Sequence, residues 1–349
     1  MMNFLHKRFP KDNFPPVIVH VLYLLLSVTF CYLYYHKFVT KADFYSPESS
    51  GGIYAVLNNT ALKVVQIRVF IPLVFIALKT IISLVYAAPN GGLFYIITVI
   101  QCYFILISFY FLLNAHFENK RANLWIAPVI IYPMVWNFII MNGQFFYMDF
   151  GILLAITLGY YFIVSGQFGW LMVVFFVGLF NHPSVGYLIP AFLLFNYQKL
   201  FQKKTILYAA ILSAMYIGVY VFLDFLFPRV DGYFVKVAFS RNLSLFYTLP
   251  VHIIVRDLLL IFGAMHFLVA IMLISGVWKK FRGPFLYINF VLIPYIVSVY
   301  IYFSIEEIRN YIAIIPFVLV MALMFLSTFE FSILKPIPKV TSNLKPGEN

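Results

Sequence analysis

The sequence predicts an all-α protein: a polytopic transmembrane helical bundle of about 10 membrane helices, with one further helix along the outer membrane surface. Three observations predict it. Only 10% of the 349 residues are charged and the mean hydropathy is +0.94, whereas about a quarter of a soluble domain is charged. Several apolar runs reach the ~20 residues that a helix needs to cross a bilayer. The charges cluster between these runs, with basic clusters and most acidic residues in alternate gaps.

Each long apolar run is expected to form one membrane-crossing helix. These runs lie near residues 16–36, 91–114, 124–141, 149–166, 205–227, 258–277, 285–304 and 311–330. Residues 169–197 are also apolar, but the sequence Asn181-His182-Pro183-Ser184 interrupts them. Proline removes a backbone hydrogen-bond donor and disfavours helix at the residue before it. We therefore expect a hairpin of two short helices in this segment.

The segment 61–88 is apolar enough to span the membrane, but it contains Arg68, Pro72 and Lys79. If it crosses, every later loop changes side. If it lies along the outer surface, the inner side carries 14 basic and four acidic residues, and the outer side carries 10 basic and eight acidic residues. Cytoplasmic loops of membrane proteins are rich in Lys and Arg. We therefore expect an interfacial or re-entrant helix on the outer side, which places both termini in the cytoplasm.

The chain is expected to form one integral-membrane domain, residues 1–332, followed by a disordered cytoplasmic tail, residues 333–349. No Gly/Ser linker or short-period repeat divides it, and the tail is rich in Lys and Pro. The first apolar run ends in tyrosines instead of a small-residue cleavage site, so we interpret it as a retained span. The expected location is the bacterial inner (plasma) membrane.

Several function classes find no signal in the sequence. The net charge of +12 is explained by basic inner loops, and no long basic run or basic–aromatic platform outside the spans indicates nucleic-acid binding. The sequence has no nucleotide-binding P-loop, no G-x-G-x-x-G, no H-E-x-x-H and no nucleophile elbow. Cys31 and Cys102 lack zinc or disulfide spacing. These observations argue against ATP-driven transport and against soluble-type nucleotide-sugar chemistry.

The gaps assigned to the outer side hold the candidate functional residues, because ionisable groups at membrane depth are costly and tend to mark functional cavities. The candidates are Asp43, Glu48, Arg68, Asn142, Gln144, Asp149, His182, Arg256, Glu306, Glu307 and Arg309. A carboxylate can act as a general base toward an acceptor hydroxyl, and a guanidinium fork matches phosphate oxygens. Each candidate also has a structural interpretation, as an exposed loop carboxylate, a snorkelling arginine, a Glu306–Arg309 helix pair, a polar turn or a structural histidine.

Four short motifs stand out among these residues. They are an acidic residue just beyond the first span (Asp43), a Trp/Asn-Gly-Gln turn followed by an acidic residue (Trp136, Asn142-Gly143-Gln144, Asp149), a hairpin with a polar-Pro tip (Asn181-His182-Pro183-Ser184, then Pro190) and a Glu-x-Arg-x-Tyr entry to the last span (Glu307-Ile308-Arg309-Asn310-Tyr311, then Pro316). Together they resemble the C-type (GT-C) superfamily of integral-membrane glycosyltransferases. Many members of that family carry Lys or Arg at the hairpin tip, where this chain has His182.

The resemblance implies a GT-C-like bundle and an inverting sugar transfer on the outer face of the membrane. The donor would be a polyprenyl-phosphate-linked sugar, and the acceptor a cell-envelope glycan or lipid. In this reading Asp43 orients or deprotonates the acceptor hydroxyl, and Glu48 is a weaker candidate for the same role. The resemblance also implies a hydrocarbon groove for the polyprenyl tail. A divalent cation at Asp43 and Glu48 is the one cofactor that we consider.

The remaining candidates divide into two groups by their implied role. The lipid-phosphate leaving group, whose negative charge grows in the transition state, would be bound by Arg68, Arg309 and Arg256. The sugar or acceptor pocket would be lined by Asn142, Gln144, Asp149, His182, Glu306 and Glu307.

Other functions stay open. An O-antigen or exopolysaccharide polymerase also has around ten spans, but it favours two large basic outer loops, and only residues 228–257 form a sizeable basic one. A transporter or flippase often has broken helices in two inverted halves, and the sequence has one such break, at 181–184. A structural membrane subunit is a further interpretation. As partners we consider the lipid bilayer and a subunit of a glycan-assembly system.

Overall fold

The computed structural model describes residues 15–39, 56, 58, 68–84, 90–140, 147–227, 239–248, 250–252, 262–281, 283–302, 308–329 and 336. Among these residues every named secondary-structure element is a helix, and an isolated β-bridge joins Phe117 to Pro336. The helices in the first half are α2 (Val17–Tyr34), α5 (Phe70–Ser83), α6 (Asn90–His116), α7 (Lys120–Ile126), α8 (Ile131–Met134), α9 (Tyr147–Val164), α10 (Phe168–Leu179), α11 (Leu188–Phe195) and α12 (Lys203–Leu226).

Several helices continue as tighter or wider turns without a break. The remaining elements are the π-helices η2 (Tyr35–Val39) and η4 (Val135–Ile140), the 3₁₀-helices η3 (Ala127–Ile130), η5 (Pro183–Tyr187), η6 (Tyr197–Lys199), η7 (Val277–Phe281), η8 (Ile288–Val291), η9 (Ile308–Ile314) and η10 (Ser327–Phe329), and the α-helices α13 (Phe239–Thr248), α15 (Met265–Ile274), α16 (Pro284–Tyr287), α17 (Leu292–Tyr302) and α18 (Ile315–Leu326).

The described part of the chain has six helices that are long and apolar enough to cross a membrane. They are Val17–Lys37, Asn90–His116, Lys120–Ile140, Lys203–Leu226, Pro284–Tyr302 and Tyr311–Phe329. Each corresponds to a run that the sequence predicts as a span. Shorter apolar helices lie beside them: Phe70–Ser83, Asp149–Val164, Phe168–Leu179, Pro183–Phe195 and Met265–Ile274. The protein is therefore an all-helical, multi-pass integral membrane protein.

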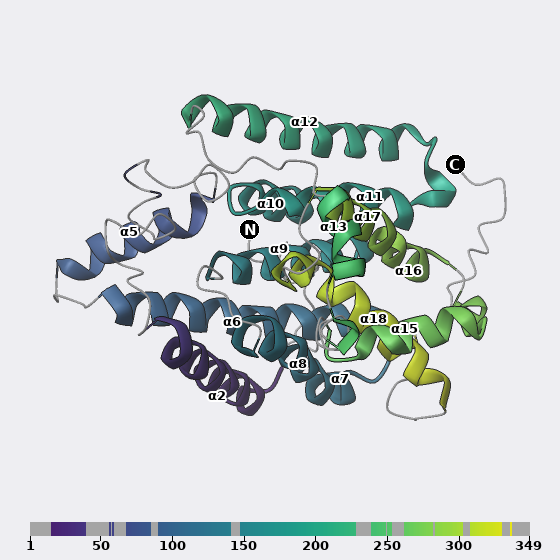
Figure 1. The fold of residues 1–349 in the computed structure, drawn as a ribbon, viewed down its shortest axis with the longest axis horizontal. Coiled ribbons are helices and arrows are strands. Elements are labelled where there is room, and N and C mark those ends of the chain that lie inside the picture. The colour runs from purple at the N-terminus through teal and green to yellow at the C-terminus, as the bar shows by residue number, and fades with distance from the viewer. Residues whose placement is uncertain are drawn as a thin grey trace.

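Helices α6, α9, α10 and α12 run side by side (Figure 1). Ring contacts show that α10 and α12 run in the same direction: Phe168 of α10 stacks on Tyr208 of α12 at 3.6 Å between ring centroids, and Phe180 lies 6.4 Å from Phe222 near the other ends of the same helices. We call one end of the bundle the Asp149 end; α2, α10 and α12 end there, and α6 and α9 begin there. The other is the Lys203 end, where α12 begins and α6 and α9 end.

Helix α5 lies at the Asp149 end. The backbone N–H of Phe70 donates to the carbonyl of Phe180, which follows α10, at 3.2 Å. Leu84 is six positions before Asn90, where α6 begins, and Figure 1 shows one end of α5 near the start of α6. Its 14 residues extend about 21 Å at 1.5 Å per residue, short of the ~30 Å hydrocarbon core. In the structure α5 thus begins and ends on one side of the bundle, as an interfacial or re-entrant placement requires.

The basic clusters gather at the Lys203 end. Its described charged residues are Glu118, Lys120, Arg121, Lys199, Lys203, Lys204, Lys279 and Lys280. Ring contacts tie these segments together, since Tyr197 lies 4.5 Å from Tyr287 and His116 lies 5.4 Å from Phe285. The structure therefore brings to one end three clusters that are far apart in the sequence, as the charge count predicts.

Cysteine accessibility tests the placement of α5. Cys31 and Cys102 are free thiols, fully buried against each other, so both can be changed to alanine. In that background Lys37→Cys and Ser83→Cys place one exposed thiol before α5, at the Asp149 end, and one exposed thiol at the end of α5. A membrane-impermeant maleimide is expected to label these two from the same side of sealed vesicles, and to label Lys120→Cys from the other side. Labelling of Lys37→Cys and Ser83→Cys from opposite sides would mean that α5 crosses.

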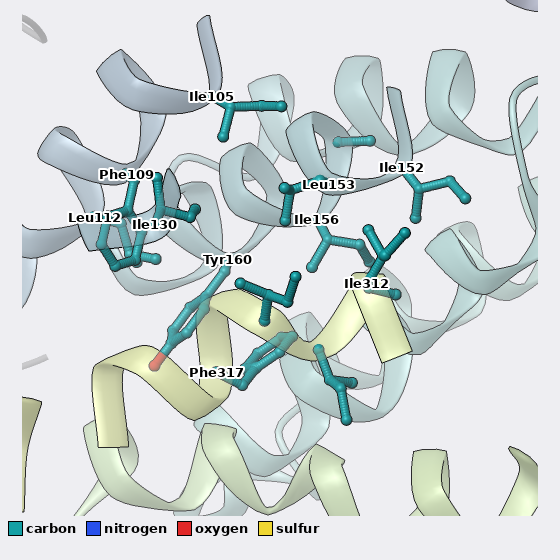
Figure 2. Packing of buried hydrophobic residues seen from close by; sticks show 14 of the residues in the cluster. Ile105, Phe109, Leu112, Ile130, Ile152, Leu153, Ile156, Tyr160, Ile312 and Phe317 are labelled. Atoms are coloured by element: carbon teal, nitrogen blue, oxygen red, sulfur yellow. The ribbon is translucent and has the colours of Figure 1, made fainter. Parts of the chain in front are cut away.

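The core lies where α6, α9, η9 and α18 meet. Tyr160 of α9 is fully buried and stacks on Phe317 of α18 at 4.5 Å between ring centroids. Figure 2 shows these two rings among aliphatic side chains from α6, η3, α9 and η9. The Tyr160 hydroxyl donates to Asn289 Oδ1 at 2.8 Å and lies 3.1 Å from His116 Nε2. One tyrosine thus links three elements through both its ring and its hydroxyl.

Candidate functional site

A buried ion pair lies at the Asp149 end and joins two of the predicted site residues. Arg68, just before α5, places Nη1 3.3 Å from Oδ1 of Asp149, and the two side chains are 9% and 3% exposed. Asp149 is in the first turn of α9, where the helix dipole favours a negative charge. The residues are 81 positions apart in the sequence. The fold therefore assembles a cation and an anion in a place that water scarcely reaches.

The interruption at 181–184 forms the tip of the predicted hairpin, beside this ion pair. The backbone N–H groups of Asn181 and His182 both donate to the carbonyl of Gly178 at 2.9 Å. His182 has an extended backbone, and its Nδ1 accepts from the N–H of Ser184 at 3.0 Å, so it caps η5. The structure thus places His182 next to the site and also assigns it a structural role.

Glycine lets the hairpin tip approach α9. A Cβ atom at Gly151 would lie 2.8 Å from Nδ2 and 3.0 Å from Oδ1 of Asn181, which is closer than two such atoms approach. Asn181 itself is 2% exposed. Because Gly151 is two residues from Asp149, the Asn181 carboxamide is held close to the ion pair. Sequence reasoning found the tip and missed the contact, since a glycine in an apolar helix has no signal of its own.

A tyrosine of α17 completes this part of the bundle. Tyr295 is 3% exposed, its hydroxyl is hydrogen-bonded to Ser184, and it lies within electrostatic reach of Asp149. Its ring is 4.5 Å from that of Tyr187, whose hydroxyl is hydrogen-bonded to Ser298. Sequence reasoning also missed Tyr295, because a tyrosine in an apolar span resembles any other aromatic residue of a membrane helix. The fold therefore brings tyrosine hydroxyls to the same part of the bundle as the Arg68–Asp149 ion pair.

An apolar cavity of about 400 Å³ adjoins the ion pair, between α5, α6, α9 and α10. This volume lies within the 300–1,000 Å³ of typical small-molecule sites. Its walls are nearly all aliphatic, from residues such as Ile71, Leu154 and Val174. At the Asp149 end it is bounded by Phe70, Gly151 and Asn181, which are within two residues of Arg68, of Asp149 and of His182. The cavity can therefore hold a hydrocarbon chain whose polar end reaches the charged pair.

The other predicted site residues are placed only in part. Asp43, Glu48, Asn142, Gln144, Arg256, Glu306 and Glu307 lie outside the described residues. Arg309 lies on η9, whose backbone packs against α9 and η4, so its backbone is at the Asp149 end as well. Among the described residues no three His, Cys, Asp or Glu side chains come together to hold a metal ion. The predicted metal candidates, Asp43 and Glu48, fall outside that search.

Comparisons with protein-family models, with curated proteins and with solved structures found no match to this chain.

Proposed function

We propose that this protein is a membrane glycosyltransferase that moves a sugar from a polyprenyl-phosphate-linked donor to a cell-envelope glycan or lipid acceptor. The observation that carries the proposal is the buried Arg68–Asp149 pair, each partner of which is within two residues in sequence of the lining of an apolar cavity. Ionisable groups at membrane depth are costly and tend to mark functional sites. Sugar transfer from a lipid-linked phosphate needs a cation for the donor phosphate and an apolar space for a lipid substrate, and this part of the bundle offers both.

The chemistry assigns each charge a role. The acceptor oxygen attacks the anomeric carbon of the sugar, the bond from that carbon to the phosphate oxygen breaks, and the hydroxyl proton passes to the Asp43 carboxylate. Negative charge grows on the departing lipid phosphate, which Arg68, Arg309 and Arg256 stabilise. Asp149 orients the Arg68 guanidinium by accepting its hydrogen bond at 3.3 Å. Glu306, Glu307, Asn142, Gln144 and His182 serve the sugar and acceptor pocket.

The proposal includes an orientation in the membrane. The shorter apolar helices complete about ten membrane crossings of the GT-C type, with α5 on the outer surface. The Lys203 end faces the cytoplasm, because its loops carry most of the described Lys and Arg residues and such loops stay inside. Both termini are then cytoplasmic, and sugar transfer takes place on the outer face of a bacterial inner membrane. A partner subunit could present the acceptor.

Sugar transfer by the purified protein in liposomes tests the proposal. Polyprenyl-phosphate hexoses and pentoses serve as radiolabelled donors, with a membrane-lipid extract as acceptor. The wild type is expected to transfer label, and Asp43→Asn to reduce the rate by about 10²- to 10⁴-fold, the range of a lost general base. Lys79→Met, on α5 at some distance from the ion pair, should keep the full rate.

The products separate the alternatives. Transfer of single sugars supports a transferase, and long glycan chains would indicate a polymerase instead. A rate for Asp43→Asn equal to that of the wild type, or no transfer from any donor in the panel, would contradict the mechanism.

A further inference from the structure

The inner end of the apolar cavity carries a polar group. Gln101 of α6 lines it and is 8% exposed, and its Oε1 is buried with no hydrogen-bond partner among the described residues. On the neighbouring helices, Leu158 and Val173 are the lining residues furthest from the Asp149 end. From Gly151 to Leu158 the helix rises about 10 Å. The cavity therefore has a polar group at each end, Asn181 near the ion pair and Gln101 in the interior.

The cavity also reaches the side of the bundle. Three of its lining residues are exposed on the outer surface of the helices: Ile100 by 45%, Val173 by 52% and Val177 by 36%. All three are aliphatic and lie on apolar helices, so this surface faces lipid when the protein is in a membrane. A lipid chain can enter sideways between α6 and α10, whereas a water-soluble ligand would have to cross the bilayer.

A buried amide without a hydrogen-bond partner is costly, so its retention needs a reason. A hydroxyl both donates and accepts, and it satisfies a carboxamide in either orientation of its O and N atoms. A polyprenyl tail has no polar atom to offer at this depth. We propose that the cavity binds the chain of a lipid with a hydroxyl group at mid-chain, which hydrogen-bonds to Gln101 while the headgroup lies near Arg68.

This inference deepens the proposed function, on which it rests for what the bound lipid does: the hydroxylated lipid is the acceptor, its headgroup meets the donor phosphate near Arg68, and the polyprenyl tail of the donor lies outside this cavity. Binding of the lipid depends on the cavity alone, so it can be measured without sugar transfer.

Paired fatty acids test the inference. The probes are octadecanoate, its mid-chain hydroxy derivative and polyprenyl phosphate, and the measurement is the affinity of the full-length protein in detergent for each. The wild type is expected to prefer the hydroxylated chain by about fivefold to tenfold, the effect of one buried hydrogen bond. Gln101→Leu should abolish this preference and bind octadecanoate at least as well. Gln167→Leu, the same substitution just before α10 and outside the cavity lining, should keep the preference.

The outcomes are distinct. An equal preference in the wild type and in Gln101→Leu, or displacement of the hydroxylated chain from the cavity by polyprenyl phosphate in the wild type, would overturn the inference. Gln101→Leu removes a buried polar group, so its melting temperature should not fall, and loss of folding is not an expected explanation. If the hydroxyl preference is observed but no sugar is transferred, the lipid assignment of the cavity is supported and the proposed glycosyltransferase activity is contradicted. If sugar is transferred but the hydroxyl preference is absent, the activity is supported and the lipid assignment is contradicted.

Discussion

Asp149→Ala is expected to lower the free energy of unfolding by about 3 to 5 kcal/mol, the usual cost of removing one partner of a buried ion pair. The variant takes away the carboxylate 3.3 Å from Arg68 and leaves a guanidinium that is 9% exposed. It also removes a favourable charge from the first turn of α9. Denaturant unfolding in detergent micelles measures the loss.

The double variant Arg68→Met/Asp149→Leu separates stability from function. Well-packed apolar residues often replace a buried ion pair at no cost in stability, so the double variant is expected to unfold close to the wild type. It should nevertheless have no transferase activity, because both charges of the proposed site are gone. Lys79→Met is the matched control on α5 and should change neither quantity. Full activity in a stable double variant would show that the pair is only structural.

Tyr160→Ala is expected to destabilise the protein by about 3 to 5 kcal/mol, the range for truncating a large buried aromatic residue. The residue is fully buried and stacked on Phe317, so the substitution leaves a cavity between α9 and α18 (Figure 2). Tyr160→Phe keeps the ring and removes the hydroxyl that donates to Asn289. Its expected cost is smaller, about 1 to 3 kcal/mol, because a buried acceptor loses its partner.

The comparison of the two Tyr160 variants tests the assignment of the hydroxyl network. Asn289→Leu in the Tyr160→Phe background should recover part of the loss, since the hydroxyl donor and its Asn289 acceptor are then both replaced by apolar groups. Tyr132→Phe, at a half-exposed aromatic residue of α8, is the control and should change stability by less than about 0.5 kcal/mol. A Tyr160→Phe variant as stable as the wild type would mean that the network contributes nothing.

The sequence by itself determined the class of the protein and which end of the bundle its charges occupy. Apolar runs of membrane-crossing length leave a helix as the way to satisfy every backbone hydrogen bond in lipid. Lys and Arg clusters mark helix ends, and counting them was enough to place the residue pairs Lys120-Arg121 and Lys279-Lys280 together. The same count predicted an interfacial or re-entrant placement for 61–88, and the described helix α5 begins and ends on one side of the bundle. These properties depend on composition and on short stretches of chain, so a one-dimensional pattern carries them.

Only the tertiary structure decided which side chains meet. The sequence placed Arg68 and Asp149 on the same side of the bundle, but their 3.3 Å contact depends on how α5 packs against α9 and on the tip after α10. The cavity, its inner Gln101 and the hydroxyl of Tyr295 had no separate sequence signal. In a membrane helix most residues are apolar on every face, so periodicity does not indicate which face meets another helix. The packing of small residues such as Gly151 against Asn181 determines which helix faces are in contact.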